Sequence, residues 1–138
     1  MVLVDGQGVP LGVHLSSASP SEARLAEATL DNVAVPRRRG RPRKKPERII
    51  ADTGYDWRAL WERMKKRGID LIAPHHPTHT NHFQDGRKLR RYRRRWIVER
   101  TNAWLFNFRR LVVRYENKLE HYRAFFYMAC ALIALRQF

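Results

Sequence analysis

Strand-like and helix-like segments alternate through the middle of the chain. Residues 48–51 (RIIA) and 70–74 (DLIAP) are short apolar runs typical of strands. Between them, residues 57–67 have the pattern of a helix, with Asp56 as its expected N-cap and Gly68 as its stop. This alternation predicts an α/β fold in which helices cover the faces of a sheet.

Further elements are expected on both sides of this unit. Residues 1–16 contain two β-rich runs around the turn sequence DGQG (5–8), which predicts a hairpin. The sequence SPSE (19–22) has the residue types of a helix start. We expect a long helix over residues 87–115 and a last helix over residues 119–136. A chain of 138 residues fits one domain.

The chain is strongly basic. Lys and Arg number 28 against 13 Asp and Glu, which gives a net charge of +15. Solubility alone does not require so much positive charge, so we expect a polyanionic partner. Arginine forks onto phosphate, and its abundance favours nucleic acid over a membrane. The apolar run at 124–135 is too short for a bilayer, which needs about 20 apolar residues. The single cysteine, Cys130, indicates a reducing compartment.

A basic loop is expected at residues 36–47 (PRRRGRPRKKPE), where four Gly and Pro residues break regular structure. The Gly-Arg-Pro sequence at 40–42 resembles an AT-hook, an arm that lies in the A·T minor groove. The simpler interpretation is a solvated linker that touches phosphates. Under both interpretations we expect Arg41, Arg43 and Lys44 to contact DNA, with a steep salt dependence.

Two acids are candidates for chemistry. Asp52 directly follows a predicted strand, and functional groups of open α/β sheets collect at the carboxyl ends of strands. Glu99 is an isolated acid among the arginines of a predicted helix. Asp52 could instead be an ordinary loop acid, and Glu99 a surface residue in an i,i+4 pair with Arg95. If the two carboxylates lie together, they could hold Mg²⁺, an ion that prefers oxygen ligands.

The segment 91–115 has two different helical faces. At about 100° per residue, Thr101 and several large apolar side chains form one seam, which we expect to pack in the core. The opposite face is mostly polar. The seam comprises Ile97, Thr101, Trp104, Phe108, Leu111 and Tyr115, and the opposite face comprises Tyr92, Arg95, Glu99, Phe106 and Arg110.

Other aromatic and apolar residues are also assigned to the core rather than to a binding surface. We expect this of all four tryptophans, Trp57, Trp61, Trp96 and Trp104. We expect it of the last helix at Tyr122, Phe125, Phe126, Ala129, Leu132 and Ile133.

A histidine-rich loop is expected at residues 75–86, with histidines at positions 75, 76, 79 and 82. Such a cluster raises the question of a zinc site. Pro77 and the lack of a cysteine or acid at fitting positions favour an ordinary loop.

Three stretches together resemble a known family. They are ADTGYD (51–56), the pattern Y-x-x-R-x-x-x-E formed by Tyr92, Arg95 and Glu99, and ERTNAWLFNFRRLVVRYE (99–116). They resemble bacterial insertion-sequence transposases of the DDE type, in the insertion sequence four/five superfamily. The resemblance covers nearly the whole chain and implies an RNase H-like catalytic core, a mixed sheet flanked by helices.

The resemblance also implies roles for individual residues. Asp52 corresponds to the second catalytic acid of the family and Glu99 to the third, with Mg²⁺ or Mn²⁺ as the cofactor. Tyr92 and Arg95 are companions of Glu99 on the same helical face, expected at the DNA. The family signature often has a Lys seven residues after the Glu.

This chain has Phe106 at the position of that Lys. We therefore expect Arg109 or Arg110 to supply the positive charge. The implied reaction is cleavage of DNA strands at the transposon ends, followed by strand transfer into target DNA. A homo-oligomer and a cytoplasmic, nucleoid-associated location in a bacterium are expected.

The first catalytic Asp of the family has no counterpart in this chain. Asp5 is the nearest candidate, but its Asp-Gly setting marks a turn residue. We therefore expect a downstream portion of a transposase, lacking one metal ligand, the first strand and an N-terminal DNA-binding region. A frameshift product that joins an upstream reading frame, a truncation and a decayed element all fit. We expect little activity from this chain alone, and an inactive nucleic-acid-binding protein is the alternative.

Overall fold

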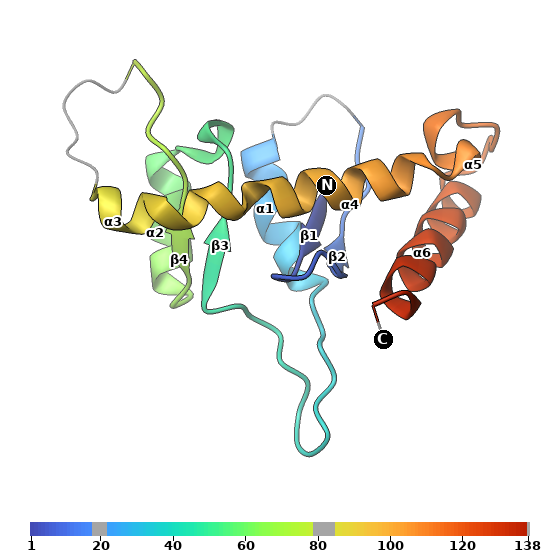
Figure 1. The fold of residues 1–138 in the computed structure, drawn as a ribbon, viewed down its shortest axis with the longest axis horizontal. Coiled ribbons are helices and arrows are strands. Elements are labelled where there is room, and N and C mark those ends of the chain that lie inside the picture. Colours follow the sequence, from blue (N-terminus) through green and yellow to red (C-terminus); the bar gives the residue numbers. More distant parts are fainter. Residues whose placement is uncertain (18–21, 79–84, 138) are drawn as a thin grey trace.

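The computed structural model describes residues 1–17, 22–78 and 85–137, which form a mixed α/β fold (Figure 1). Residues 19–21 of the predicted helix start lie outside these ranges, and so do His79 and His82 of the histidine-rich loop. Within the described ranges, no helix combines the length and apolar character needed to cross a membrane.

The N-terminal hairpin is confirmed. Strands β1 (Val2–Val4) and β2 (Pro10–Val13) are antiparallel, with a bulge after Leu3. Asp5 is a turn residue, because its Oδ1 accepts hydrogen bonds from the backbone N–H groups of Gln7 (2.8 Å) and Val9 (2.9 Å).

The predicted strand–helix–strand unit is also confirmed. Strands β3 (Arg48–Ile50) and β4 (Asp70–Ile72) are parallel neighbours, and helix α2 (Arg58–Lys66) connects them. A short 3₁₀ helix, η1 (Thr53–Tyr55), follows β3. The two strand pairs form separate two-stranded sheets rather than the single sheet we expected. The hairpin is held to the rest of the fold by side-chain packing and by hydrogen bonds from side chains, instead of a shared backbone ladder.

Asp56 does not cap α2 as predicted. Trp57 occupies the N-cap position and makes no side-chain capping bond. The backbone N–H of Asp56 closes η1 by donating to the carbonyl of Thr53 (2.9 Å), and its carboxylate is buried against the segment that follows β4. Tertiary hydrogen bonds therefore replace the local cap.

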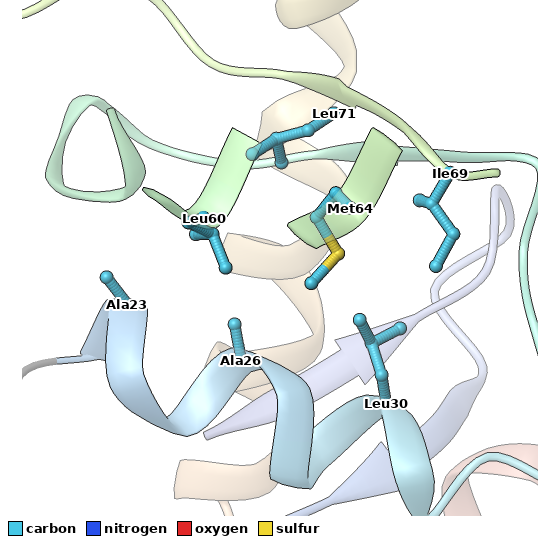
Figure 2. Packing of buried hydrophobic residues seen from close by; sticks show 7 residues of the cluster. All are labelled: Ala23, Ala26, Leu30, Leu60, Met64, Ile69 and Leu71. Carbon is cyan, nitrogen blue, oxygen red and sulfur yellow. The ribbon is translucent and has the colours of Figure 1, made fainter. Parts of the chain in front are cut away.

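The first core cluster joins helix α1 (Glu22–Asp31) to the β3–β4 unit. Helix α1 contributes two alanines and Leu30, and α2 contributes its two most buried side chains (Figure 2). The cluster comprises Ala23, Ala26, Leu30, Leu60, Met64, Ile69 and Leu71.

The second core cluster joins the hairpin to helices α4 (Trp96–Phe106), α5 (Arg109–Val112) and α6 (Leu119–Leu135). It comprises Val13, Leu105, Leu111, Phe126, Ala129 and Ile133. Alternate hairpin side chains serve different clusters, as the two faces of a strand require. Met1 and Leu3 pack against the first cluster, whereas Val2 and Val13 belong to the second.

The expected helix over 87–115 is one rod only as far as Phe106 (Figure 1). Helix α3 (Gly86–Leu89) runs into a 3₁₀ segment, η2 (Arg90–Arg95), and then into α4. The rod ends because Phe108 leaves the helical conformation and packs against the second core cluster, so that α5 starts in a new direction.

The predicted seam of this helix is correct in its centre and wrong at its end. Ile97, Thr101 and Leu111 are buried, and Trp104 and Phe108 pack against the second cluster. Tyr115 is 67% exposed because it lies beyond α5, where the helical repeat no longer applies.

Several residues expected in the core are exposed. Trp57 is 41% exposed and lies under the Arg63 guanidinium, and Trp96 is 52% exposed and lies under that of Arg100. The last helix is confirmed, but its Leu132 is 47% exposed. A cation over each indole ring lets the tryptophans remain at the surface.

Candidate active site

Asp52 lies at the carboxyl end of β3, as predicted. The backbone N–H of Ala51 donates to the carbonyl of Ile72 (2.9 Å), which continues the pairing with β4 by one residue. Asp52 then begins η1, and its Oδ1 accepts hydrogen bonds from the backbone N–H (2.6 Å) and hydroxyl (3.2 Å) of Thr53. The chain turn thus fixes one face of the carboxylate.

Two side chains of η2 bind the same carboxylate. The hydroxyl of Tyr92 donates to Asp52 Oδ1 (3.2 Å), and Arg95 Nη1 donates to Oδ2 (3.3 Å). Tyr92 and Arg95 share a face because a 3₁₀ helix has three residues per turn. The 3₁₀ geometry of η2 therefore directs both side chains to Asp52.

Arg95 also binds Glu99. Its Nη2 lies 2.6 Å from Oε1 of Glu99, which is four residues further on, in the first turn of α4. A single guanidinium thus contacts both acids that the sequence pointed to. The i,i+4 pair weighed as the ordinary interpretation of Glu99 is present, and it is what connects Glu99 to Asp52.

The Asp52 carboxylate is kept ionised, and the site is open to solvent. The hydrogen bond from Thr53 N lowers the pKa of Asp52, burial partly opposes it, and Arg95 and Tyr92 lower the pKa further. Burial and the negative charge of Asp52 raise the pKa of Tyr92, so its hydroxyl stays protonated. The side chains of Asp52 and Glu99 are 49% and 54% exposed.

The N-terminal hairpin positions the helix that carries Glu99. Thr101, which is fully buried, donates its hydroxyl to the carbonyl of Gly8 (2.8 Å). Arg94 and Arg100 donate to the carbonyls of Gly6 and Gln7. Three successive turn carbonyls thus hold the end of η2 and the first half of α4 against the hairpin. Sequence reasoning missed this contact, although the turn sequence DGQG marks the place.

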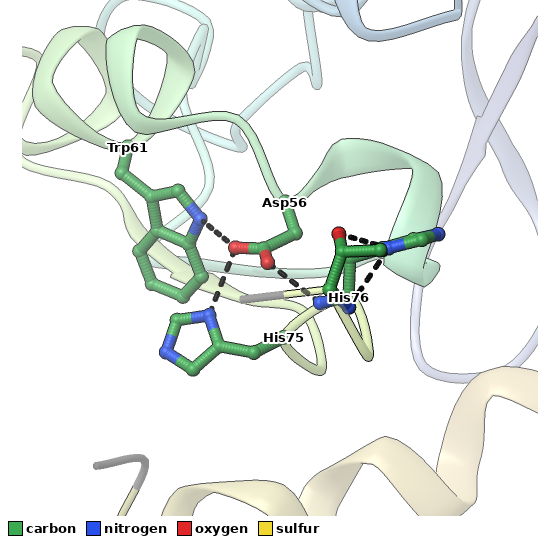
Figure 3. Close-up of polar contacts among 5 residues, drawn as sticks. Asp56, Trp61, His75 and His76 are labelled. Atoms are coloured by element: carbon green, nitrogen blue, oxygen red, sulfur yellow. Dashed lines mark hydrogen bonds and ion pairs between the residues drawn. The ribbon is translucent and has the colours of Figure 1, made fainter. Parts of the chain in front are cut away.

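A second polar cluster lies at the same edge of the β3–β4 sheet (Figure 3). The Asp56 carboxylate, whose side chain is 5% exposed, binds the indole N–H of Trp61 (3.2 Å) and His75 Nδ1 (2.9 Å). It also accepts a hydrogen bond from the backbone N–H of His76 (2.7 Å). Asp56 therefore joins η1, α2 and the segment after β4 beside Asp52.

Carboxylate oxygens of Asp52 and Glu99 are ligands that Mg²⁺ and Mn²⁺ accept. Among residues 1–17, 22–78 and 85–137, no group of three His, Cys, Asp or Glu side chains could hold a metal ion. The described chain therefore offers two carboxylates at this site, and carboxylates are the type of ligand that a hard divalent ion prefers.

The other predicted DNA-binding residues lie away from this site. Arg41, Arg43 and Lys44 lie in the basic loop, which precedes β3, whereas Asp52 follows it. Arg110 lies in α5, at the far end of the rod, where it pairs with Glu116 (3.0 Å). Arg109 begins the same short helix. The structure thus brings together Asp52, Tyr92, Arg95 and Glu99.

Comparisons with known proteins agree with the resemblance. A family model described as "Transposase DDE domain" matches residues 1–134. The chain is 34% identical over 133 residues to a Burkholderia cepacia protein named "Putative transposase for insertion sequence element IS402". The match covers 96% of this chain and 60% of that relative, so the chain spans less than two thirds of the relative's length. No solved structure matches the chain significantly.

Proposed function

The chain belongs to the DDE transposase family, and we propose that Asp52 and Glu99 are the metal-binding carboxylates through which it takes part in DNA strand cleavage and strand transfer. The observation that carries this proposal is the shared contact with Arg95, which brings the two acids together from β3 and α4. The other elements of the proposal are an RNase H-like core, transposon-end and target DNA as substrates, and a homo-oligomer at work on the bacterial nucleoid.

Asp52 and Glu99 would hold Mg²⁺ or Mn²⁺. When bound, the ion supplies positive charge that stabilises the negative charge developing at a phosphodiester. Thr53 and Tyr92 orient the Asp52 carboxylate and keep it ionised through their hydrogen bonds. Without an ion, the positive charge of Arg95 offsets the repulsion between the two carboxylates.

The DNA backbone would lie along the η2–α4 rod. Arginines 90, 91 and 93 are exposed on η2, beside the residues that bind Asp52. Their guanidinium groups match phosphate geometry and would hold the strand over the two acids. Two carboxylates paired with an arginine bind a divalent ion weakly, so we expect little cleavage by this chain alone. A third acid, as in the family pattern, or the product of an upstream reading frame would complete the site.

The metal site can be tested by NMR with Mn²⁺, whose unpaired electrons broaden nearby amide signals. We expect selective broadening of the amides of Thr53 and Arg100, next to the two acids. Asp52→Asn and Glu99→Gln should each remove the broadening at both positions, since each leaves a single carboxylate.

Glu62→Gln is the matched control. Glu62 forms an i,i+4 pair with Arg58 (3.1 Å) on α2, as Glu99 does with Arg95, but no aspartate of the described ranges joins it. This variant should retain the broadening. Two outcomes would contradict the metal site: broadening of amide signals near many surface acids, or unchanged broadening in Asp52→Asn. The function would then be nucleic-acid binding without metal chemistry.

A further inference from the structure

The basic loop, residues 36–47, is a projecting hairpin. Val35 and Arg43 exchange two backbone hydrogen bonds of 2.9 and 2.8 Å, which close its projecting part, residues 36–42. Gly40 turns the chain at the tip with a positive φ of 87°, a conformation that other residues rarely adopt. The loop extends away from the helices and strands (bottom of Figure 1), and nearly all of its residues are exposed.

Most of the positively charged side chains on this loop form no ion pair or hydrogen bond within the described chain. The loop contains seven Lys and Arg residues and one acid, Glu47. Arg43 pairs with Glu47 (2.7 Å), and Lys45 donates to the carbonyl of Arg67 (2.9 Å). The remaining five cations make no hydrogen bond or ion pair with any residue in the described ranges: Arg37, Arg38, Arg39, Arg41 and Lys44.

A concavity at the base of the loop collects several of these cations. It has a volume of about 650 Å³ and lies between the loop and Gly68. Its basic lining residues are Arg37, Arg41, Arg43, Lys44 and Lys45. Glu47 is the one acid in this lining and already pairs with Arg43, so the positive charges outnumber the negative ones, and their mutual repulsion favours an anionic group in the concavity.

The loop and the candidate active site lie at opposite ends of the same strand. The loop leads into β3 at Arg48, whereas Asp52 follows the carboxyl end of β3. In Figure 1 the loop extends away from the edge at which η1 lies. A phosphate held in the loop therefore belongs to a different stretch of DNA from the phosphodiester at Asp52.

We propose that the basic loop is a separate DNA-binding arm that holds the backbone phosphates of duplex DNA outside the segment being cleaved. This inference rests on the proposed function for the identity of its polyanion. The arm supplies affinity, through charge and without reading the sequence, while Asp52 and Glu99 supply the chemistry. Both the unpaired cations and the basic concavity are accounted for by bound phosphates.

The test compares two triple variants for binding to a labelled duplex in EDTA, by fluorescence anisotropy over a range of salt concentrations. The loop variant is Arg37→Ala/Arg41→Ala/Lys44→Ala. Because each phosphate contact contributes about 0.9 to the slope of log K against log salt, we expect the slope to decrease by about 3. We expect affinity to decrease by about 10- to 100-fold at moderate salt.

The control variant removes the same charge from the body of the protein, with Arg24→Ala/Lys65→Ala/Lys66→Ala on α1 and α2. These cations are exposed and form no ion pair in the described chain. The control variant should lower the slope by less than about 0.9, the contribution of one phosphate contact. Equal losses in both variants would mean that net charge alone binds DNA and would overturn the proposal.

Two further measurements separate the alternatives. In competition, poly(dA·dT) and poly(dG·dC) should displace the labelled duplex equally well. A clear preference for A·T would make the loop a minor-groove reader and would overturn phosphate binding as its mode. The loop variant should still show Mn²⁺ broadening at Thr53, which reports a folded chain, so failure of the arm and failure of the metal site are distinguishable.

Discussion

At the scale of single residues, Arg95 connects the two acids of the candidate site. It contacts Asp52 through Nη1 and Glu99 through Nη2, and its own side chain is 33% exposed. Its charge lowers the pKa of Asp52 and offsets the repulsion between the carboxylates. The same charge opposes the entry of a divalent cation. Arg95 therefore brings the two acids together and would compete with the metal ion that we propose they bind.

Replacing Arg95 with Gln should separate these two effects. We expect the pKa of Asp52 to rise, because a neighbouring positive charge is lost, and Mn²⁺ affinity to increase several-fold, because the ion no longer competes with the guanidinium. The ¹³C shift of the Asp52 carboxyl during a pH titration and the Mn²⁺ titration measure the two changes. Arg58→Gln is the control, and weaker Mn²⁺ binding in Arg95→Gln would show that Arg95 acts only by holding the acids together.

The direction of the pKa shift also sets a pH dependence of stability. Since the pKa of Asp52 is lower in the folded chain, its interactions stabilise the fold above the unfolded pKa of about 3.9. This contribution is lost as pH falls through the folded-state pKa. Arg95→Gln should make that loss smaller in acid unfolding experiments, because less of the shift remains.

At the scale of elements, the junction between η2 and α4 aligns the functional side chains. Tyr92 and Arg95 are three residues apart in a 3₁₀ helix, and Arg95 and Glu99 are four apart in an α-helix. Each spacing equals about one turn of the helix in which it occurs. The change of helix type at Arg95 therefore places all three side chains on one face, toward Asp52.

The hairpin turn holds this junction in place, and Gly8 is its least replaceable residue. Gly8 has a φ of 93°, and an added Cβ would lie 2.8 Å from the Thr101 hydroxyl oxygen. Gly8→Ala should therefore destabilise the protein by about 1–3 kcal/mol. It should also weaken Mn²⁺ binding, because α4 must move away from the turn. Urea unfolding and the Mn²⁺ titration measure the two effects.

Gly86→Ala is the control for this prediction. Gly86 begins α3, its φ is not positive, and an added Cβ would meet no atom within 4 Å. This variant should change stability by no more than about 0.5 kcal/mol. Equal effects of the two substitutions would show that the contact between the hairpin and α4 does not position the site.

At the scale of the whole molecule, the hairpin joins two core clusters. One face of the hairpin packs with α1 and α2, and the other face packs with α4, α5 and α6. In Figure 1 the hairpin accordingly lies near the centre, with α1 and α2 on one side and α6 on the other. The candidate active site depends on both clusters, because Asp52 follows β3, which packs with the first cluster, and Glu99 belongs to α4, which packs in the second.

This shared element predicts that the two clusters unfold together. Leu60 in the first cluster and Ile133 in the second are 1% and 2% exposed. Leu60→Ala and Ile133→Ala should each lower the free energy of unfolding by about 2–5 kcal/mol, within a single transition. Circular dichroism and tryptophan fluorescence during urea unfolding provide two probes. Separate transitions, with each substitution shifting only one, would show that the clusters are independent.

The local parts of this architecture could be predicted from the sequence. The hairpin, the strands β3 and β4, α2 and α6 follow from turn residues and hydrophobic runs, which act between neighbours in the chain. Asp52 and Glu99 could be selected because each stands alone, one at a strand end and one among arginines. The comparisons confirm the family resemblance, while the roles of the two acids stay predictions.

Only the tertiary structure decided how these parts meet. It placed one guanidinium between Asp52 and Glu99, turned Asp56 from a helix cap into a buried hydrogen-bond acceptor, and left Trp57 and Trp96 exposed beneath arginines. Sequence periodicity indicates which face of a segment is apolar and where the segment turns or is capped. These outcomes depend instead on contacts between residues tens of positions apart, whose packing and charge outweigh such local preferences.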